Sequence, residues 1–135
     1  MKKVLITGAG SYIGTSFEHY LTEHYPGMYD VCTVVFHVAG IAHIKETDEN
    51  AELYYKVNRD LTVECAKKAL SEQVPHFVFL SSMSVYGMNS GRIIKETEPS
   101  PTTNYGKSKL EAENDLNILA NQFPNTFTVA ILRPP

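Results

Sequence analysis

The chain has 135 residues, enough for one domain with a hydrophobic core but few for a complete two-domain enzyme. It is 43% hydrophobic and 20% charged, with a formal net charge of -3 and no block of like charge, so neither nucleic acid nor an anionic membrane is an expected partner. The first apolar run, Val4 to Ile6, is too short for a signal peptide or a membrane span, and a cytoplasmic location is the expectation.

The N-terminal part predicts a strand, a helix and a second strand. Residues 3–7 are β-branched and aliphatic and stop at a glycine, which is typical of a short buried strand. Residues 12–23 carry apolar side chains at helical spacing, and Pro26-Gly27 ends that helix. The continuous apolar run at 32–38 indicates a strand buried on both faces, as in a parallel sheet.

The rest of the chain repeats this alternation. Residues 49–71 have the helical period, and they are followed by an apolar strand at 76–80 and by a loop at 87–103 that is rich in Gly, Ser, Thr and Pro. A further helix is predicted at 105–123 and a last strand at 127–132. The order β-α-β-α-β-α-β predicts an α/β fold, a doubly wound parallel sheet with right-handed crossovers. In such a sheet, ligands bind outside the carboxyl ends of the strands.

The two cysteines and five histidines show no metal-ligand or CxxC spacing. Cys32 and Cys65 lie in apolar surroundings, so buried free thiols are expected and no metal site is predicted. The distinctive residues lie instead where three of the strands end.

The first distinctive stretch is the turn from Thr7 to Gly14, which joins a strand to a helix. Its glycines allow a tight turn and a close backbone approach, and the following helix N-terminus offers N–H donors and a positive dipole end to a pyrophosphate. The turn therefore fits a dinucleotide-binding loop. A plain strand-to-helix connection has the same composition and stays open as the alternative.

Tyr105 and Lys109 form the second group, four residues apart at the start of a predicted helix. They share one helix face and can address the same ligand. A phenol is a poor base at neutral pH, but a nearby ammonium favours the phenolate, so Tyr105 is a candidate general acid/base. Taken alone, such a pair is more often part of a solvated helix surface.

The third group follows the strand at 76–80, where Ser81, Ser82 and Ser84 stand in the stretch Ser-Ser-Met-Ser-Val-Tyr-Gly. Hydroxyls at a strand end can bind a reacting oxygen, or they can simply satisfy the loop backbone. Only their combination with the other two groups favours a functional role.

The order and spacing of the three groups closely resemble the extended short-chain dehydrogenase/reductase family, the NAD-dependent nucleotide-sugar epimerases and dehydratases. The resemblance runs over nearly the whole chain. Besides the three groups it includes the strand end His37-Val38-Ala39-Gly40, Asn58 in the following helix, and Leu132-Arg133-Pro134-Pro135. It implies a Rossmann-like NAD(P)-binding domain over residues 1–135.

The resemblance also implies roles for individual residues. Tyr105 would remove a proton from a sugar hydroxyl, Lys109 would hold the nicotinamide ribose, and Ser82 would hydrogen-bond the reacting oxygen. Ser81 and Ser84 are second candidates for the serine role, and Tyr86 would pack beneath the site. The predicted cofactor-binding residues are Gly8, Gly10, Ser11, Tyr12, Ile13, Gly14, Ala39, Gly40, Asn58, Ser81, Tyr105, Lys109 and Pro134.

Three functions stay open at this point. The favoured one is an NAD-dependent nucleotide-sugar epimerase-like oxidoreductase that transfers hydride and proton at a sugar carbon, because Met83-Ser84 stands where the family's 4,6-dehydratases have Asp-Glu. An NADP-dependent carbonyl or keto-sugar reductase of the same superfamily is the second. A non-catalytic dinucleotide-sensing domain is the third, and the presence of Ser82, Tyr105 and Lys109 together argues against it.

The chain departs from the family pattern in two places. Ser11 stands where the family has its second glycine, and Gly10 is the expected source of the missing flexibility. Tyr29-Asp30-Val31 runs almost directly into the strand at 32–38, so a βαβ unit of roughly 30 residues is absent. Asp30 is consequently a weak candidate for binding the adenosine ribose, and NADP stays possible beside NAD.

The chain stops at Pro135, where the family continues into a smaller substrate-binding domain, so the domain is expected to be incomplete. The resemblance implies a nucleotide-sugar substrate and a homodimer formed through the helices at 49–71 and 105–123. Three apolar residues of these helices either contribute to that contact or belong to the core: Tyr54, Leu70 and Leu116.

Overall fold

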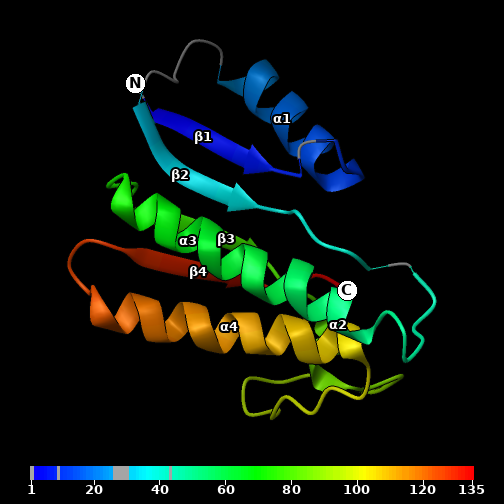
Figure 1. Cartoon of the computed structure of the whole chain (residues 1–135). Helices are drawn as coiled ribbons and strands as arrows, with labels where there is room; N and C mark the ends of the chain where they lie inside the picture. Colours follow the sequence, from blue (N-terminus) through cyan, green and yellow to red (C-terminus); the bar gives the residue numbers. More distant parts are fainter. Residues whose placement is uncertain (1, 9, 26–30, 43) are drawn as a thin grey trace.

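The computed structural model of the chain describes residues 2–8, 10–25, 31–42 and 44–135, with helices and strands alternating as Figure 1 shows. The elements are β1 (Lys2–Thr7), α1 (Tyr12–His24), β2 (Val31–His37), α2 (Ala51–Tyr55), η1 (Lys56–Asp60), α3 (Leu61–Ser71), β3 (His76–Leu80), η2 (Met83–Tyr86), α4 (Asn104–Gln122) and β4 (Thr128–Leu132). The strands and helices predicted from the sequence are confirmed, with small shifts at their ends.

The four strands form one parallel sheet in the order β1-β2-β3-β4, which confirms the predicted α/β fold. Val35 of β2 lies opposite Phe77 of β3, which lies opposite Val129 of β4, so these side chains share one face. The helices α3 and α4 pack against this face. The core between them consists of Val35, Ala66, Ala69, Val74, Phe77, Phe79, Ala112, Leu116 and Phe127.

The helix α1 covers the opposite face of the sheet. Phe36 follows Val35 in β2 and therefore points to the other side, where its ring centroid lies 4.5 Å from that of Phe17 in α1. In Figure 1, α1 lies beside β1 and β2 and away from α3 and α4. Helices thus flank both faces, as a doubly wound sheet requires.

The first crossover has the opposite hand from the other two. Each connection moves one strand further in the same direction across the sheet, yet α1 lies on one face while α3 and α4 lie on the other. The connections through α3 and α4 have the right-handed form that proteins strongly prefer, so β1-α1-β2 is left-handed. The prediction of right-handed crossovers throughout is therefore wrong for this unit. The cause is the position of β2. It lies next to β1 on the side of β3, while the helix α1 that connects the two strands packs on the face opposite to α3 and α4.

The helix predicted at 49–71 is divided by the π-helical turn η1. The N–H of Leu61 reaches back to the carbonyl of Lys56, and a turn of this kind accommodates an extra residue. Leu53 and Leu61, two of the apolar residues whose spacing predicts the helix, are each 44% exposed. The polar residues Asn58 and Thr62 are buried in their place. The helix is therefore rotated relative to its apolar pattern. Apolar periodicity alone does not reveal this rotation, because it results from hydrogen bonds of buried polar side chains.

Several smaller expectations are also decided by the structure. Tyr54 and Leu116 are fully buried and Leu70 packs against the core, so these residues belong to the core. Cys65 is a free thiol that is only half-buried beside the core, and burial raises its pKa. No helix in the described part of the chain is long and apolar enough to cross a membrane. The helix stop at Pro26-Gly27, the Asp30 candidate and the thiol of Cys32 lie outside what the structure describes.

Candidate active site

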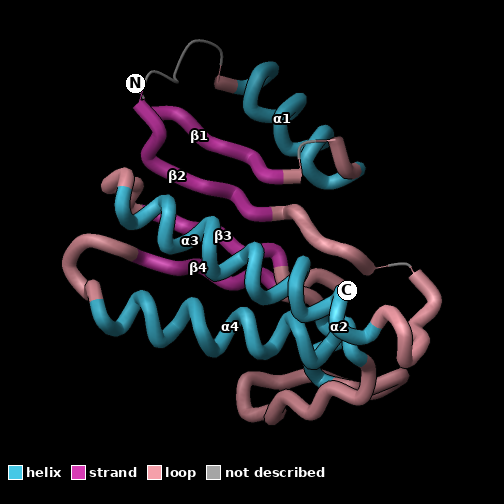
Figure 2. The backbone as a smooth tube through the Cα atoms, viewed as in Figure 1, coloured by secondary structure: helices cyan, strands magenta, loops and turns pink. Residues whose placement is uncertain are grey.

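The connections that follow β1, β2 and β3 emerge at the same edge of the sheet, as expected for the carboxyl ends of parallel strands (Figure 2). A cavity of about 680 Å³ lies at this edge. The predicted catalytic residues Ser82, Tyr105 and Lys109 all line it. Further predicted site residues in its walls are Ser11, Tyr12, Ile13, Gly40, Ser81 and Pro134.

Gly8 provides the close approach between the glycine turn and the segment after β2. Its φ is +77°, and a Cβ at this position would lie 2.7 Å from the backbone nitrogen of Ala39. Glycine is therefore required here. A Cβ on Gly10 would meet no atom within 4 Å, and Ser11 has ordinary extended backbone with φ -78° and ψ 162°. The expectation that Gly10 compensates for Ser11 is thus wrong, because Ser11 adopts a conformation open to any residue.

Ser11 forms the N-cap of α1. Its Oγ accepts the N–H of Gly14 at 3.1 Å. The following residues Tyr12 and Ile13 line the cavity, so the first turn of α1 faces it. Backbone N–H groups and the positive end of the helix dipole favour an anion at such a position.

Ser82 is the second residue after β3 and caps the short helical turn η2. Its Oγ accepts the N–H of Ser84 and donates to the Ser84 Oγ, both at 3.1 Å. Gly106 packs against the same turn, since a Cβ there would lie 2.5 Å from the Ser84 carbonyl oxygen. The turn that carries Ser82 and the first turn of α4, which carries Tyr105, are therefore in direct contact.

Sequence reasoning missed the residue that anchors the start of α4. The Glu46 carboxylate accepts the backbone N–H groups of Asn104 and Tyr105, each at 2.9 Å. Thr103 caps the same helix, and its Oγ1 accepts the N–H of Gly106 at 3.0 Å. Glu46 lies in the segment after β2, far from α4 in the chain, and no spacing rule connects the two.

Lys109 is buried, with 4% of its surface exposed. Its Nζ donates to the Leu80 carbonyl oxygen at 2.9 Å and lies 4.7 Å from the centroid of the Phe79 ring. Burial lowers the pKa of Lys109 to about 8, while the nearby Glu113 carboxylate acts to raise it. At neutral pH the side chain is therefore mostly a cation and a hydrogen-bond donor inside the cavity wall.

A second feature that the sequence did not predict is the polar contact chain around His37. The ring is fully buried, with Nδ1 at 2.7 Å from Thr7 Oγ1 and Nε2 at 2.9 Å from Thr62 Oγ1. Burial lowers the pKa of His37 to about 4, and the Lys109 cation acts in the same direction. A neutral imidazole thus ties β1, β2 and α3 together beneath the cavity.

Asn58 supports the cavity wall from behind. Its Oδ1 accepts the N–H of Ile41 at 2.8 Å, and its Nδ2 donates to the Ile41 carbonyl oxygen at 3.0 Å and to Ser108 Oγ at 3.2 Å. The amide therefore links the segment after β2 to α4. Five of the predicted cofactor-binding residues lie behind or beside the cavity walls instead of lining them: Gly8, Gly10, Gly14, Ala39 and Asn58.

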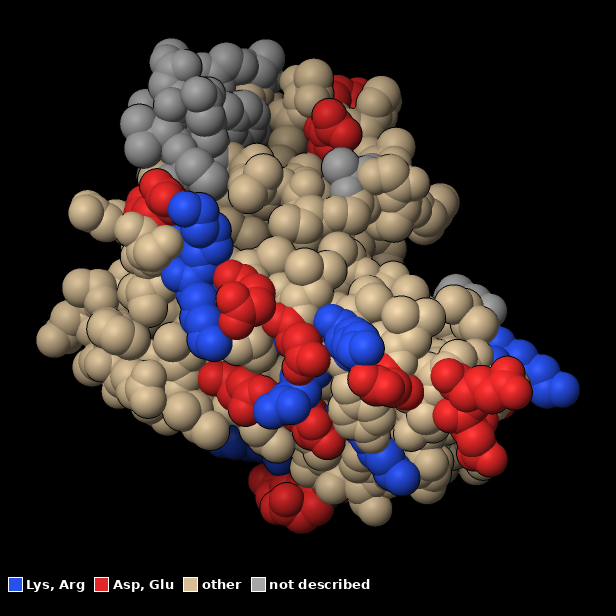
Figure 3. All heavy atoms as spheres, in the orientation of Figure 1, with Lys and Arg blue, Asp and Glu red and all other residues tan. Residues whose placement is uncertain are grey.

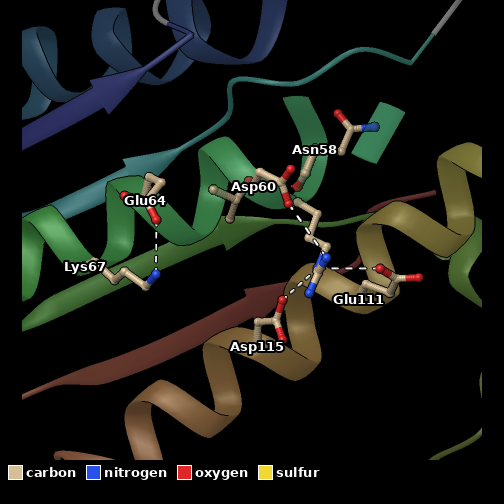
Figure 4. Close-up of polar contacts among 8 residues, drawn as sticks. Asn58, Asp60, Glu64, Lys67, Glu111 and Asp115 are labelled. Atoms are coloured by element: carbon tan, nitrogen blue, oxygen red, sulfur yellow. Dashed lines mark hydrogen bonds and ion pairs between the residues drawn. The ribbon is translucent and has the colours of Figure 1, made fainter. Parts of the chain in front are cut away.

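The surface away from the cavity carries mixed charge. Acidic and basic side chains alternate over α3 and α4 on the face drawn in Figure 3. Figure 4 shows Asp60, Glu111 and Asp115 directed toward one guanidinium group, that of Arg59, whose Nε lies 2.8 Å from Asp115 Oδ2. The described residues contain no group of three or more His, Cys, Asp or Glu side chains suited to a metal ion.

Comparison with known proteins gives a consistent picture. Residues 28–135 match the NAD dependent epimerase/dehydratase family. A UDP-glucose 4-epimerase from Vibrio cholerae is 39% identical over 110 residues, which cover 76% of this chain and 32% of that protein. The structure of UDP-glucuronic acid 4-epimerase from Bacillus cereus in complex with NAD is 21% identical and has a TM-score of 0.86 over 98% of this chain and 55% of that one. The UDP-Glc/GlcNAc 4-epimerase from Campylobacter jejuni also has a TM-score of 0.86, at 20% identity, over 98% of this chain and 53% of that one. The chain thus has the fold of these structures and spans about half of their length and about a third of the curated relative.

Proposed function

The chain belongs to the NAD dependent epimerase/dehydratase family, and on that premise we propose that it forms the cofactor-binding part of an NAD-dependent nucleotide-sugar epimerase-like oxidoreductase. The observation that carries the proposal is the meeting of Ser82, Tyr105 and Lys109 with the first turn of α1 around one cavity. The activity is proposed for the whole protein, since the chain covers 32% of the V. cholerae relative.

The residues around the cavity fit a dinucleotide. A Cβ on Gly40 would lie 2.9 Å from Asn58 Oδ1 and 3.2 Å from Lys109 Nζ, so Gly40 leaves room that a larger residue would fill. The start of α1 would hold the pyrophosphate, and Lys109 would donate to the hydroxyls of the nicotinamide ribose. When bound, the nicotinamide ring supplies a hydride acceptor and donor.

The side chains of the cavity divide the proton chemistry between them. Tyr105 would take the proton from a sugar hydroxyl as its carbon is oxidised, and would return a proton when the carbon is reduced. Ser82 would donate its proton to the same sugar oxygen in place of the bond to Ser84 Oγ, while its Oγ keeps accepting the N–H of Ser84. The buried Lys109 cation would stabilise negative charge on the Tyr105 oxygen more strongly than a solvated one does.

The cavity favours reversible oxidation over elimination of water. Met83 and Ser84 follow Ser82 at the start of η2, and neither supplies a carboxylate. No acidic side chain of the described chain lines the cavity. Removal of water from a sugar needs an acid and a base placed on adjacent carbons, and the residues here provide one such group, Tyr105.

The decisive experiment adds UDP-sugars to the full-length protein and follows sugar interconversion together with NADH absorbance. We expect epimerisation without net accumulation of NADH, because hydride returns to the sugar in each cycle. Consumption of added NADPH with a ketone substrate would instead assign the protein as a carbonyl or keto-sugar reductase. Cofactor binding without turnover of any of these substrates would assign it as a dinucleotide-sensing domain.

We also propose a homodimer through the outer faces of α3 and α4. Ile118 of α4 is 57% exposed on this face, near the ion pairs of Arg59 with Glu111 and Asp115. Single exposed apolar residues are common on protein surfaces, so the proposal rests on the family resemblance, and Ile118 marks the position where a substitution would test it. Analytical ultracentrifugation should give twice the chain mass for the wild type and a smaller species for Ile118→Asp, and a wild-type monomer at micromolar concentration would contradict the proposal.

The cytoplasmic location expected from the sequence stays a prediction.

A further inference from the structure

Glu113 is a buried carboxylate, with 2% of its surface exposed, and it lies one helical turn after Lys109 in α4. Both of its oxygens are hydrogen-bonded. Ser81 Oγ donates to Oε1 at 2.5 Å, while Arg133 donates from Nε to Oε1 at 3.0 Å and from its NH2 group to Oε2 at 2.5 Å. A carboxylate this deeply buried is tolerated when it is paired and fully hydrogen-bonded, as it is here.

The contacts of Glu113 join three segments that each carry a wall of the cavity. Ser81 directly precedes Ser82, Lys109 shares the face of α4 with Glu113, and Arg133 follows the end of β4. A displacement of the Glu113 carboxylate would therefore move Ser82 and Lys109 relative to each other. The polar cluster lies directly beneath the two groups that are proposed to meet the reacting oxygen and the ribose.

Arg133 is held in place from its other side by Tyr86. An NH1 proton of Arg133 is donated to the Tyr86 hydroxyl oxygen at 2.6 Å, and the guanidinium carbon lies 4.9 Å from the centroid of the Tyr86 ring. The Glu113 carboxylate and the Tyr86 hydroxyl raise the pKa of Arg133 further, so the guanidinium stays charged beside Glu113. The expectation that Tyr86 packs beneath the site stays a prediction, and its contacts with Arg133 support it.

Glu113 also sets the charge around Lys109. The titratable groups that face Lys109 in the described structure are His37 from β2, Tyr105 from its own helix, and Glu113. Neutral His37 adds no charge near pH 7, and burial acts to deprotonate Lys109. The carboxylate of Glu113 is the group among these whose charge favours the lysine cation.

We propose that Glu113 is a positioning residue of the active site, which fixes Ser82 relative to Lys109 through its contacts with Ser81 and Arg133 and holds a carboxylate one helical turn from Lys109. The inference deepens the proposed function, and its activity readout rests on that function. Glu113 itself does not line the cavity and touches neither substrate nor cofactor in this account.

The variant Glu113→Gln keeps the size of the side chain and removes its charge. In the full-length protein we expect kcat to fall about tenfold or more, with KM for the UDP-sugar and Kd for NAD within about threefold of wild type. The alkaline limb of the pH-rate profile should also move to lower pH, because Lys109 loses the carboxylate that favours its cation. A residue with a purely structural role would lower kcat without moving this limb.

A second readout does not depend on turnover. In a 13C NMR titration of the Lys109 ε-carbon, Glu113→Gln should lower the titration midpoint. If the wild type turns over no nucleotide sugar, the proposed function is wrong, and this titration still decides whether Glu113 controls Lys109. The matched control is Glu72→Gln, which removes an exposed carboxylate paired with Lys68 at the far end of α3 and should change neither kcat nor the titration.

Unpaired Arg133 could prevent Glu113→Gln from folding. In that event the double variant Glu113→Gln/Arg133→Gln, which leaves no unpaired charge, takes its place and should show the same two shifts. An unchanged Lys109 titration in a folded variant would overturn the proposal. A loss of kcat that merely follows a loss of thermal stability, with the alkaline limb in its wild-type position, would overturn it as well.

Discussion

The two walls of the cavity are built by regions that are packed very differently. The helix α1, which follows the glycine turn, buries one residue, Gly14, and meets the sheet through the contact of Phe17 with Phe36. The helix α4 buries six residues: Gly106, Ser108, Lys109, Ala112, Glu113 and Leu116. Regions with few buried contacts open locally at a lower free energy. We therefore expect the wall proposed to carry the catalytic residues to be organised before any ligand binds, whereas the wall proposed for the pyrophosphate depends more on the ligand itself.

The topology separates the same two regions. The β1-α1-β2 unit is the left-handed crossover of the sheet, and among the described strands β1 lies at the edge and pairs with β2. The two crossovers that build the wall with Ser82, Tyr105 and Lys109 have the usual hand and enclose the core. A weakly preferred topology and a sparsely buried helix thus coincide at the N-terminal end of the chain.

The largest expected effect lies in the well-packed region, at Tyr105. Replacing Tyr105 with Phe removes one hydroxyl and leaves the backbone contacts with Glu46 in place. We expect turnover to fall by a factor of about 100 to 10,000, with NAD affinity and thermal stability close to wild type. Initial rates and NAD titrations of the full-length protein check this, with Tyr20→Phe on the exposed side of α1 as the control. Retained activity in Tyr105→Phe would reject the assignment of the proton-transfer residue.

The next effect concerns the joint between the two regions, where His37 contacts Thr7 of β1 and Thr62 of α3. The pKa of His37 is about 4 in the folded protein and 6.5 in the unfolded chain, so between these values the unfolded state binds more protons. The contribution of neutral His37 to the free energy of unfolding should be present in full well above pH 6.5. About 3 kcal/mol of it should be lost as the pH falls to 4.

Urea denaturation across this pH range measures the effect of His37. In the variant His37→Gln, the part of the pH dependence that belongs to the imidazole should be missing. The same slope in wild type and variant would show that His37 does not couple the two regions through its protonation.

The smallest effect is expected in the weakly packed region, at Gly8. The substitution Gly8→Ala places a Cβ 2.7 Å from the nitrogen of Ala39 at a φ of +77°, which costs about 1–3 kcal/mol in a rigid setting. We expect a loss of stability at the lower end of this range, because the sparsely packed backbone around Gly8 can shift to make room for the Cβ. We also expect weaker NAD binding. Gly10→Ala, which meets no atom within 4 Å, should leave stability unchanged in the same thermal melts. Equal destabilisation by both substitutions would contradict the assigned role of Gly8.

The sequence predicts much of the fold because its signals are local. The alternation of apolar runs, the glycine turn at Gly8 and the pair Tyr105 and Lys109 each depend on short spacings. Since parallel strands share one carboxyl edge, these spacings also suffice to gather Ser82 with the pair at one cavity.

The features that the sequence did not predict all depend on partners distant in the chain. Glu46 anchors α4, Thr62 turns inward to meet His37, and Glu113 of α4 is paired with Arg133 from the segment after β4. The left-handed crossover is of the same kind, because it follows from which strand lies beside β1 and on which face α1 packs. No local propensity or periodicity carries this information.

Hydrogen exchange of the protein with and without NAD tests the central claim most directly, because it reports cofactor binding at the predicted wall independently of turnover. Without NAD, we expect amides at 4–7 and 12–24 to exchange faster than those at 108–116. Saturating NAD should slow the first group about tenfold or more and change the second group much less. Exchange that is equally slow in both groups and indifferent to NAD would contradict both the proposed cofactor site and the difference between the two regions.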